Sequence, residues 1–326
     1  MQELADIWNI EYVKVPHWNQ PTHVENMLKD IASDTIQMFW ISDTNPLVSL
    51  PDLPQARKLL TKPNLFVICQ DIFMTETAAI ADVVLPAAMW GEKTGCFTNA
   101  DRTVHLSHQA IDPPGEARSG LEIFLDFARR MDFRDKDGNI LMPWTKPEEV
   151  FEAWKHLSAG RPCDYIAFSY EKLTGGSGIQ WPCNAENPLG TERLFSDGLF
   201  YTDIEYCESF GHGLETGAPY SRDQYRTFHP AGRAVLKAAH YIPPLEEPDD
   251  EYPLQLSIGR NVYHFHTRTK TGRSKQLQEA APAPRITLSK SDAHELQIED
   301  DIVLVESRGG TIEIAASMFV PFHYGY

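Results

Sequence analysis

Residues 65–86 read LFVICQDIFMTETAAIADVVLP, and this stretch decides the fold class. It opens with a continuous apolar run, residues 65–69, that ends at Gln70 and Asp71. Residues 75–81 then predict a short helix with Thr75 as its N-cap, and the apolar run 83–85 follows until Pro86 stops it. Short, wholly apolar runs on either side of a short helix are typical of strands in a buried parallel sheet. The stretch therefore predicts an α/β fold.

The preceding residues repeat this pattern. Residues 38–41, MFWI, form a third apolar run, and the turn at 42–46 ends it because the residue before Pro46 is disfavoured in a helix. Residues 53–60 contain good helix formers and predict the next helix. Ligands of parallel sheets bind beyond the carboxyl ends of the strands. The polar residues at those ends are Asp43, Thr44, Asn45, Gln70 and Asp71.

The length of 326 residues predicts about two domains, and the pattern along the chain changes twice. Residues 1–145 alternate strand and helix patterns, whereas residues 146–250 are rich in glycine, proline and aromatic side chains and are expected to form ordered loops. Residues 251–326 turn to strand patterns at 254–258, 285–288, 302–306 and 311–315, which predict a small β-barrel domain. Because an apolar strand ends the sequence, we expect the barrel to continue beyond Tyr326.

Composition and charge exclude several classes of protein. The chain has 29 Lys and Arg against 46 Asp and Glu, a formal net charge of −17, which argues against a general nucleic-acid or anionic-membrane binder. We find neither an apolar run of membrane-spanning length nor a signal-peptide pattern, and so expect no membrane insertion of this chain. The cysteines contain no C-x-x-C pair, which argues against a disulfide scaffold, a zinc ribbon or an iron–sulfur ligand set and predicts a reducing cytoplasm. They are Cys69, Cys96, Cys163, Cys183 and Cys207.

Residues 252–278, called the basic segment below, contain five Lys or Arg and no Asp or Glu. In an acidic chain this pattern indicates either a solvated basic face or a local anion site. Interleaved Thr, Ser and Gly favour the anion site, because hydroxyl and backbone N–H groups are donors to phosphate oxygens. His264 and His266 could also be zinc ligands, but no third ligand is in view and the basic neighbours would repel a cation. A hydrogen bond to a phosphate suits them better.

Six stretches together resemble a known family. They are TNP at 44–46, QDIFMTETAAIADVVLPAAMWGEKTGCFTNADR at 70–102, PGEAR at 114–118, GIQWPC at 178–183, GRNVYHFHTRTKTGR at 259–273 and VPFHYGY at 320–326. In this order they resemble molybdopterin oxidoreductases that bind molybdenum bis(molybdopterin guanine dinucleotide), above all assimilatory-type nitrate reductases and related formate dehydrogenases. The resemblance covers essentially the whole chain and corresponds to about the carboxyl-terminal half of such an enzyme.

The resemblance implies a fold and a set of cofactor contacts. It implies a Rossmann-like domain at 1–145, a loop-rich connection at 146–250 and a double-psi β-barrel, incomplete at its end, at 251–326. Asp71 would accept hydrogen bonds from guanine, and the basic segment would meet the pyrophosphates. One departure is Gly120, where some relatives carry an aspartate that contacts a nucleotide. The implied cofactor-binding residues are Asn45, Gln70, Asp71, Lys93, Ile258, Gly259, Arg260, His264, His266, Thr267 and Phe322.

The resemblance also implies that the reaction centre lies elsewhere. The iron–sulfur cysteines and the molybdenum ligand of the family belong to an amino-terminal part, so we expect this chain alone to be inactive, with no metal ligand and no identified catalytic residue. Asp71 as a catalytic acid is a weaker alternative, because strand-end carboxylates more often bind ligands. Three functions remain: a nitrate reductase-like oxo-transfer enzyme with an electron-transfer partner, a formate dehydrogenase with the same cofactor, or a non-catalytic nucleotide- or cofactor-binding module.

Overall fold

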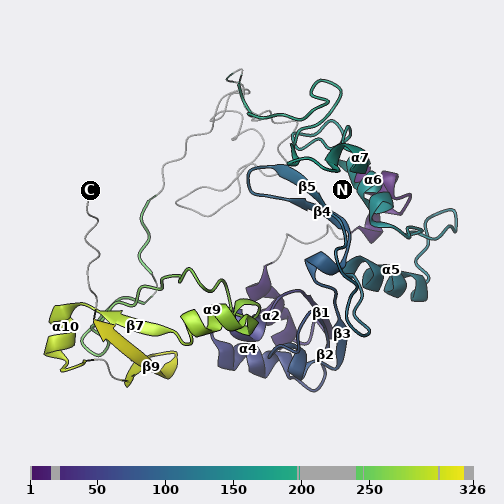
Figure 1. Cartoon of the computed structure of the whole chain (residues 1–326). Helices are drawn as coiled ribbons and strands as arrows, with labels where there is room; N and C mark the ends of the chain where they lie inside the picture. The colour runs from purple at the N-terminus through teal and green to yellow at the C-terminus, as the bar shows by residue number, and fades with distance from the viewer. Residues whose placement is uncertain are drawn as a thin grey trace. The chain divides into compact units, whose positions relative to one another are not determined.

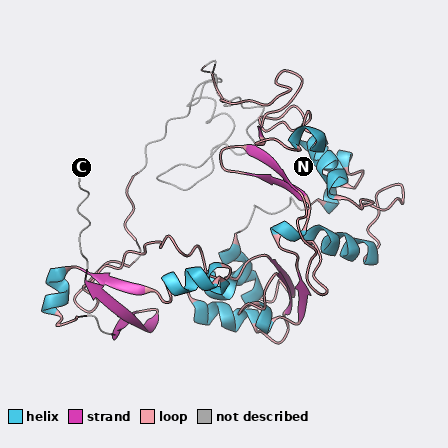
Figure 2. Ribbon diagram, viewed as in Figure 1, coloured by secondary structure: helices cyan, strands magenta, loops and turns pink. Residues whose placement is uncertain are grey.

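The computed structural model describes residues 2–15, 23–196, 198, 240–244, 246–299 and 302–318. The chain divides into two compact units, each described by itself below: unit 1 comprises Met1–His23 and Leu85–Ile242, and unit 2 comprises Val24–Val84 and Pro243–Tyr326. Figure 1 labels the elements along the chain, and Figure 2 shows that helices and strands are mixed, which confirms the α/β class. No helix in the described part of the chain is long and apolar enough to span a bilayer.

A parallel sheet forms most of the first part of unit 2, and its last strand runs on past Val84, where unit 2 gives way to unit 1. Its strands β1 (Met38–Ser42), β2 (Phe66–Asp71) and β3 (Val83–Pro86) lie in that order, with Met38 opposite Phe66 and Ser42 opposite Gln70. Helices α2 (Val24–Ala32), α3 (Pro46–Ser49) and α4 (Leu53–Leu60) supply apolar side chains to a core with the sheet. The predicted parallel strands and the helix at 53–60 are thereby confirmed. The core residues are Ile31, Ile41, Leu47, Ala56, Leu59, Leu60, Leu65 and Val67.

The predicted helix at 75–81 is shorter than expected. Only the 3-10 turn η2 (Ala78–Ile80) forms, and Thr75 Oγ1 accepts a hydrogen bond from the Ala78 N–H at 3.2 Å. A longer helix does not form, because Asp82, two residues after the turn, is bound to β2. Its carboxylate accepts a hydrogen bond from the Val67 N–H at 2.7 Å. Residues between Asp71 and Ala78 therefore form a loop, and this loop places polar side chains at the end of β2.

The second part of unit 2 contains the basic segment and a small sheet. Within this part, η4 (Thr271–Arg273) and α9 (Lys275–Ala280) precede β7 (Arg285–Leu288), α10 (Lys290–Glu295), β8 (Ile302–Ser307) and β9 (Gly310–Met318). The sheet order is β7-β9-β8, with β7 parallel and β8 antiparallel to β9, which confirms the three carboxyl-terminal strand predictions. The strand predicted at 254–258 is wrong: these residues are irregular, and no strand in the described residues pairs with them.

Unit 1 is built around an aromatic core. Its elements are α1 (Gln2–Ile7), η1 (Tyr12–Lys14), η3 (Trp90–Glu92), β4 (Gly95–Thr98), β5 (Thr103–Ser107), α5 (Gly120–Arg130), α6 (Pro147–Ser158), α7 (Tyr170–Leu173) and β6 (Ile179–Gln180). Strands β4, β5 and β6 form an antiparallel sheet that the sequence did not predict. Phe151, Tyr165 and Phe168 pack edge-on or tilted against one another beside it.

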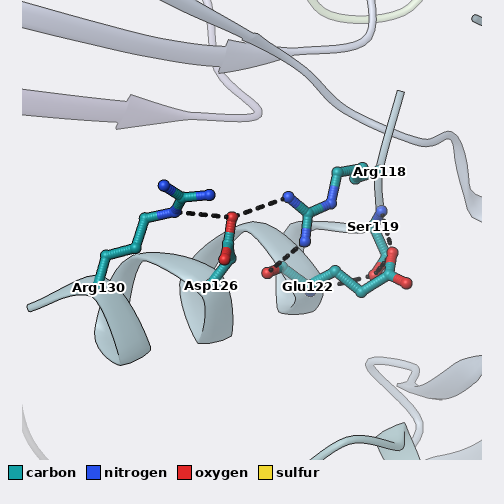
Figure 3. Close-up of polar contacts among 5 residues, drawn as sticks. All are labelled: Arg118, Ser119, Glu122, Asp126 and Arg130. Carbon is teal, nitrogen blue, oxygen red and sulfur yellow. Dashed lines mark hydrogen bonds and ion pairs between the residues drawn. The ribbon is translucent and has the colours of Figure 1, made fainter. Parts of the chain in front are cut away.

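Helix α5 begins with a capping box, drawn in Figure 3. Ser119 Oγ accepts from the Glu122 N–H at 3.2 Å, and the Glu122 carboxylate accepts from the Ser119 N–H at 2.9 Å. Arg118 and Arg130 both donate to Asp126, at 3.1 and 3.3 Å. The hydrogen bond from Arg118 is the main reason that the pKa of Asp126 lies below its usual range. Helix α5 is thus fixed at its start by side chains.

Substitution Ser119→Ala should lower the free energy of unfolding by about 1 kcal/mol, because the first turn of α5 loses its hydroxyl acceptor. Urea unfolding followed by circular dichroism measures the change. Substitution Ser119→Thr keeps the hydroxyl and should unfold close to the wild type. Equal losses in both variants would show that the capping bond contributes nothing.

Candidate functional site

The carboxyl ends of β1 and β2 meet at one edge of the parallel sheet. Ser42 lies opposite Gln70 in the register, and the Asp43 N–H donates to the Gln70 carbonyl oxygen at 2.9 Å. Asp43 adopts a left-handed backbone conformation with φ of 57°, which turns the chain sharply after the strand. The predicted polar residues at the strand ends, Asp43, Asn45, Gln70 and Asp71, are therefore brought together.

Asn45 lies inside the protein, and both polar atoms of its amide have hydrogen-bond partners there. Only 4% of the residue is exposed. Its Oδ1 accepts from the Thr77 hydroxyl at 2.7 Å and from the Thr77 N–H at 3.3 Å, while its Nδ2 donates to Glu76 Oε2 at 2.8 Å. Asn45 therefore ties the β1–α3 turn to the loop after β2.

Gln70 presents the opposite case. The residue is 0% exposed, and neither its Nε2 nor its Oε1 has a hydrogen-bond partner within the described residues. Leaving a buried amide unpaired costs about 1–3 kcal/mol per group, so such residues are rare outside functional sites. The amide at the end of β2 is accordingly a group that a polar ligand could satisfy.

Asp71 and Cys69 share this buried strand end. Burial raises the pKa of the Asp71 carboxyl, and hydrogen bonds from the Ile72 and Phe73 N–H groups oppose the rise. Asp71 Oδ1 accepts from Ile72 at 2.7 Å, and Oδ2 accepts from the Thr75 hydroxyl at 3.4 Å. Burial also raises the pKa of the Cys69 thiol to about 11. Cys69 is 0% exposed, which agrees with its predicted place in the core.

The basic segment folds around His264 and Arg268. His264 Nε2 lies 2.8 Å from the Ala281 carbonyl oxygen and Nδ1 lies 3.0 Å from the Thr271 hydroxyl. A carbonyl oxygen only accepts, so Nε2 carries a proton. Arg268 donates to the Gln278 side chain and, at 3.0 Å, to the Pro282 carbonyl oxygen. The loop is thus closed by internal hydrogen bonds.

A cavity of about 480 Å³ lies in unit 2, between the loop after β2 and the basic segment. Arg273 reaches this cavity with its guanidinium stacked over the Phe73 ring, 4.4 Å from the ring centroid. Thr267 and Thr269 add hydroxyl groups that are hydrogen-bonded to each other at 2.7 Å. The residues that line the cavity are Glu76, Thr267, Arg268, Thr269, Gly272, Arg273 and Gln278.

The other predicted site residues are more scattered. Ile258 is 89% exposed, and Gly259, Arg260 and His266 are also exposed. Lys93 belongs to unit 1 and is half-buried, and Phe322 lies outside the described residues. Sequence reasoning did not single out Glu76 or Gln278. The charge of the basic segment did indicate Arg268 and Arg273.

Two arginines, two hydroxyls and an amide around one cavity are donors suited to phosphate oxygens. The unpaired Gln70 amide is buried at the end of β2 and does not line this cavity. The described residues contain no cluster of three or more His, Cys, Asp or Glu that could hold a metal ion. The arrangement is therefore suited to binding a phosphate-bearing ligand.

Comparison with known proteins places these features in context. The family profile "Molybdopterin oxidoreductase" matches residues 18–130, and "Molydopterin dinucleotide binding domain" matches residues 254–325. The F420-dependent formate dehydrogenase subunit alpha of Methanocaldococcus jannaschii is 35% identical over 90% of this chain and 40% of its own length. The nitrate reductase of Symbiobacterium thermophilum is 32% identical over 97% of this chain and 39% of its own length.

One solved structure shares the fold. The acetylene hydratase from Pelobacter acetylenicus superposes with a TM-score of 0.57 at 20% sequence identity, over 90% of this chain and 37% of its own. The chain thus spans about 40% of the length of the curated relatives named above.

Proposed function

Because the chain belongs to the molybdopterin oxidoreductase family, we propose that it is the carboxyl-terminal, dinucleotide-binding portion of an enzyme that carries molybdenum bis(molybdopterin guanine dinucleotide). In this proposal β1–β3 belong to a Rossmann-like domain and β7–β9 to a double-psi barrel. The enzyme is nitrate reductase-like, and formate dehydrogenase is the alternative. A reducing compartment suits it, since the four described cysteines are free thiols.

One observation supports the proposal most strongly. Glu76 belongs to the segment matched by the first profile and Arg268 and Arg273 to the segment matched by the second, yet all three line one cavity of unit 2. A dinucleotide cofactor needs cationic and hydroxyl donors for its pyrophosphate and polar groups for its base. The cavity offers the donors for the pyrophosphate. The Gln70 amide is suited to the base, because neither of its polar atoms has a partner within the described residues. These residues fit part of such a cofactor.

In this proposal the residues of the chain bind the cofactor and orient it. Arg268, Arg273 and the hydroxyls of Thr267 and Thr269 would hold the phosphates, Gln70 and Asp71 would meet the guanine, and Arg260 would add a further phosphate contact. The molybdenum group supplies two-electron oxo transfer when bound, and the protein's share is to position and tune it. Nitrate is the proposed substrate, and an electron-transfer partner supplies the electrons.

Substitution Arg260→Ala should weaken cofactor binding by about tenfold or more and lower the molybdenum and guanine nucleotide content of the purified complete enzyme, because a charge-assisted hydrogen bond to phosphate is worth about 1.5–3 kcal/mol. Metal analysis and nucleotide release measure both contents. Substitution Lys58→Ala, at an exposed position of α4, is the matched control and should change neither. Full cofactor content in Arg260→Ala would count against the contact.

The substrate is decided by assaying the complete enzyme with nitrate and a reduced dye, and with formate and an oxidised dye. Nitrate reduction without formate oxidation supports the nitrate reductase-like reading. Formate oxidation supports the alternative. A complete protein that binds the cofactor and catalyses neither reaction would favour a binding module, the third reading.

A further inference from the structure

Gln278, in helix α9, brings an uncharged amide to the cavity of unit 2. Its amide oxygen accepts a hydrogen bond from Arg268 Nη2, and its amide nitrogen donates to the Pro282 carbonyl oxygen at 3.0 Å. A guanidinium only donates and a carbonyl oxygen only accepts, so these two partners fix which end of the amide is which. Gln278 therefore connects a cation at the cavity to the backbone beyond α9.

The guanidinium of Arg268 is held through a single nitrogen. Arg268 Nη2 also donates to the Pro282 carbonyl oxygen at 3.0 Å, so Arg268, Gln278 and Pro282 are hydrogen-bonded pairwise. Both hydrogens of Nη2 are thereby used. Within the described residues, every side-chain hydrogen bond of Arg268 starts from Nη2, so the Nε and Nη1 donors remain for a ligand.

The backbone of Arg268 also depends on its surroundings. Its φ is 62°, a left-handed conformation that costs free energy for a residue with a side chain and persists where neighbouring contacts fix it. The Arg268 carbonyl oxygen accepts from the Gly272 N–H at 2.8 Å. A methyl group at Gly272 would lie 3.6 Å from both Arg268 Cβ and Gln278 Oε1. These three residues are therefore packed together where they line the cavity.

We propose that Gln278 is a positioning residue, whose amide holds Nη2 of Arg268 so that Nε and Nη1 are already oriented when a phosphate of the cofactor binds. An arginine that is oriented beforehand loses less side-chain freedom on binding. A neutral amide suits this role, because it accepts from the guanidinium without cancelling the positive charge that attracts the phosphate. The identity of the ligand rests on the proposed function, whereas the hydrogen bond between Gln278 and Arg268 does not.

The experiment compares five forms of the cofactor-free complete protein: wild type, Gln278→Met, Gln278→Asn, Arg268→Ala and the double variant Gln278→Met/Arg268→Ala. Methionine is close to glutamine in length and has no amide, so Gln278→Met removes both hydrogen bonds of the amide and little else. Calorimetric titration with guanosine diphosphate should show about fivefold weaker binding for Gln278→Met, the scale of one side chain that must be ordered on binding. Gln278→Asn keeps an amide on a shorter side chain and should recover part of this loss. In the Arg268→Ala background, Gln278→Met should have no further effect.

Gln276→Met is the matched control. Gln276 lies in the same helix, is exposed and does not line the cavity, so its variant should bind guanosine diphosphate as the wild type does. Unchanged or tighter binding by Gln278→Met would overturn the proposal. An equal loss with and without Arg268 would also overturn it, because Gln278 would then act on the ligand by itself.

Urea unfolding of the wild type, the single variants Gln278→Met and Arg268→Ala, and the double variant gives a ligand-independent measure. Hydrogen-bonded residues shift the unfolding midpoint non-additively, and additive shifts would contradict the pairing of Gln278 with Arg268. If the wild type binds no guanosine diphosphate while the unfolding shifts remain non-additive, the proposed function fails and the pairing stands.

Discussion

Substitution Gln70→Leu should stabilise the cofactor-free protein and at the same time weaken cofactor binding. Gln70 is fully buried, and both polar atoms of its amide lack partners within the described residues. Leucine has a similar volume and no polar atoms, so the free energy of unfolding should rise by about 1–3 kcal/mol. The cofactor content of the complete enzyme should fall, because the amide is the group that the ligand would satisfy. Urea unfolding and metal analysis measure the two effects.

Asn45 offers a matched control at the neighbouring strand end. It is also a buried amide, but its oxygen and its nitrogen both have partners within the protein, Thr77 and Glu76. Substitution Asn45→Leu should therefore lower the free energy of unfolding by about 3 kcal/mol, since it leaves buried donors unpaired. Opposite signs for the two leucine variants are the expected result. Equal destabilisation would mean that Gln70 does have a partner in the cofactor-free protein.

The double substitution Arg268→Ala/Arg273→Ala should have the largest effect on cofactor binding. Both guanidiniums line the cavity, and removing both phosphate contacts should cost about 3 kcal/mol, or roughly a hundredfold in affinity. The complete enzyme should then be purified nearly free of molybdenum and guanine nucleotide. Metal analysis of the variant against the wild type is the measurement.

Lys275→Ala is the control for charge alone. Lys275 lies in the same basic segment, is well exposed and pairs only loosely with Glu279 at 3.9 Å. Its loss should leave cofactor content nearly unchanged. A similar drop in both proteins would indicate general electrostatic attraction rather than a site built from Arg268 and Arg273. Unfolding curves must also be compared, because Arg268 braces its own loop through Pro282.

The sequence predicted those elements whose patterns are local. The apolar runs at β1 and β2 and the helix formers of α4 are each visible within a few residues of sequence, and the structure confirms all three. The hairpin β4–β5 was not predicted. Its burial depends on aromatic side chains from residues 151–173, and the sequence of the hairpin itself does not indicate them. The strand prediction at 254–258 was wrong. Apolar and polar residues do alternate there, but a strand also needs a neighbouring strand to pair with, and none in the described residues pairs with this segment.

Some residues of the candidate site could likewise be predicted from the sequence, and others could not. Strand-end positions such as Gln70 and Asp71 follow from the general location of ligands in parallel sheets, and the basic segment follows from charge. The place of Glu76 at the cavity could not be predicted, because segments far apart in the sequence line that cavity. Asn45 is also instructive: its position was predicted, but only its contacts reveal that its amide is used within the protein.

The raised pKa of Cys69 affects how readily this thiol is oxidised. Oxidants and alkylating reagents attack the thiolate, and a thiol with a pKa of about 11 is ionised to only about one part in ten thousand at neutral pH. Cys69 is also fully buried, so reagents do not reach it in the folded protein. Conversion of Cys69, the residue before Gln70 on β2, to a sulfenic acid is thereby suppressed. In a protein proposed to handle electrons, the thiol beside the strand end that would receive the cofactor is thus shielded from oxidants.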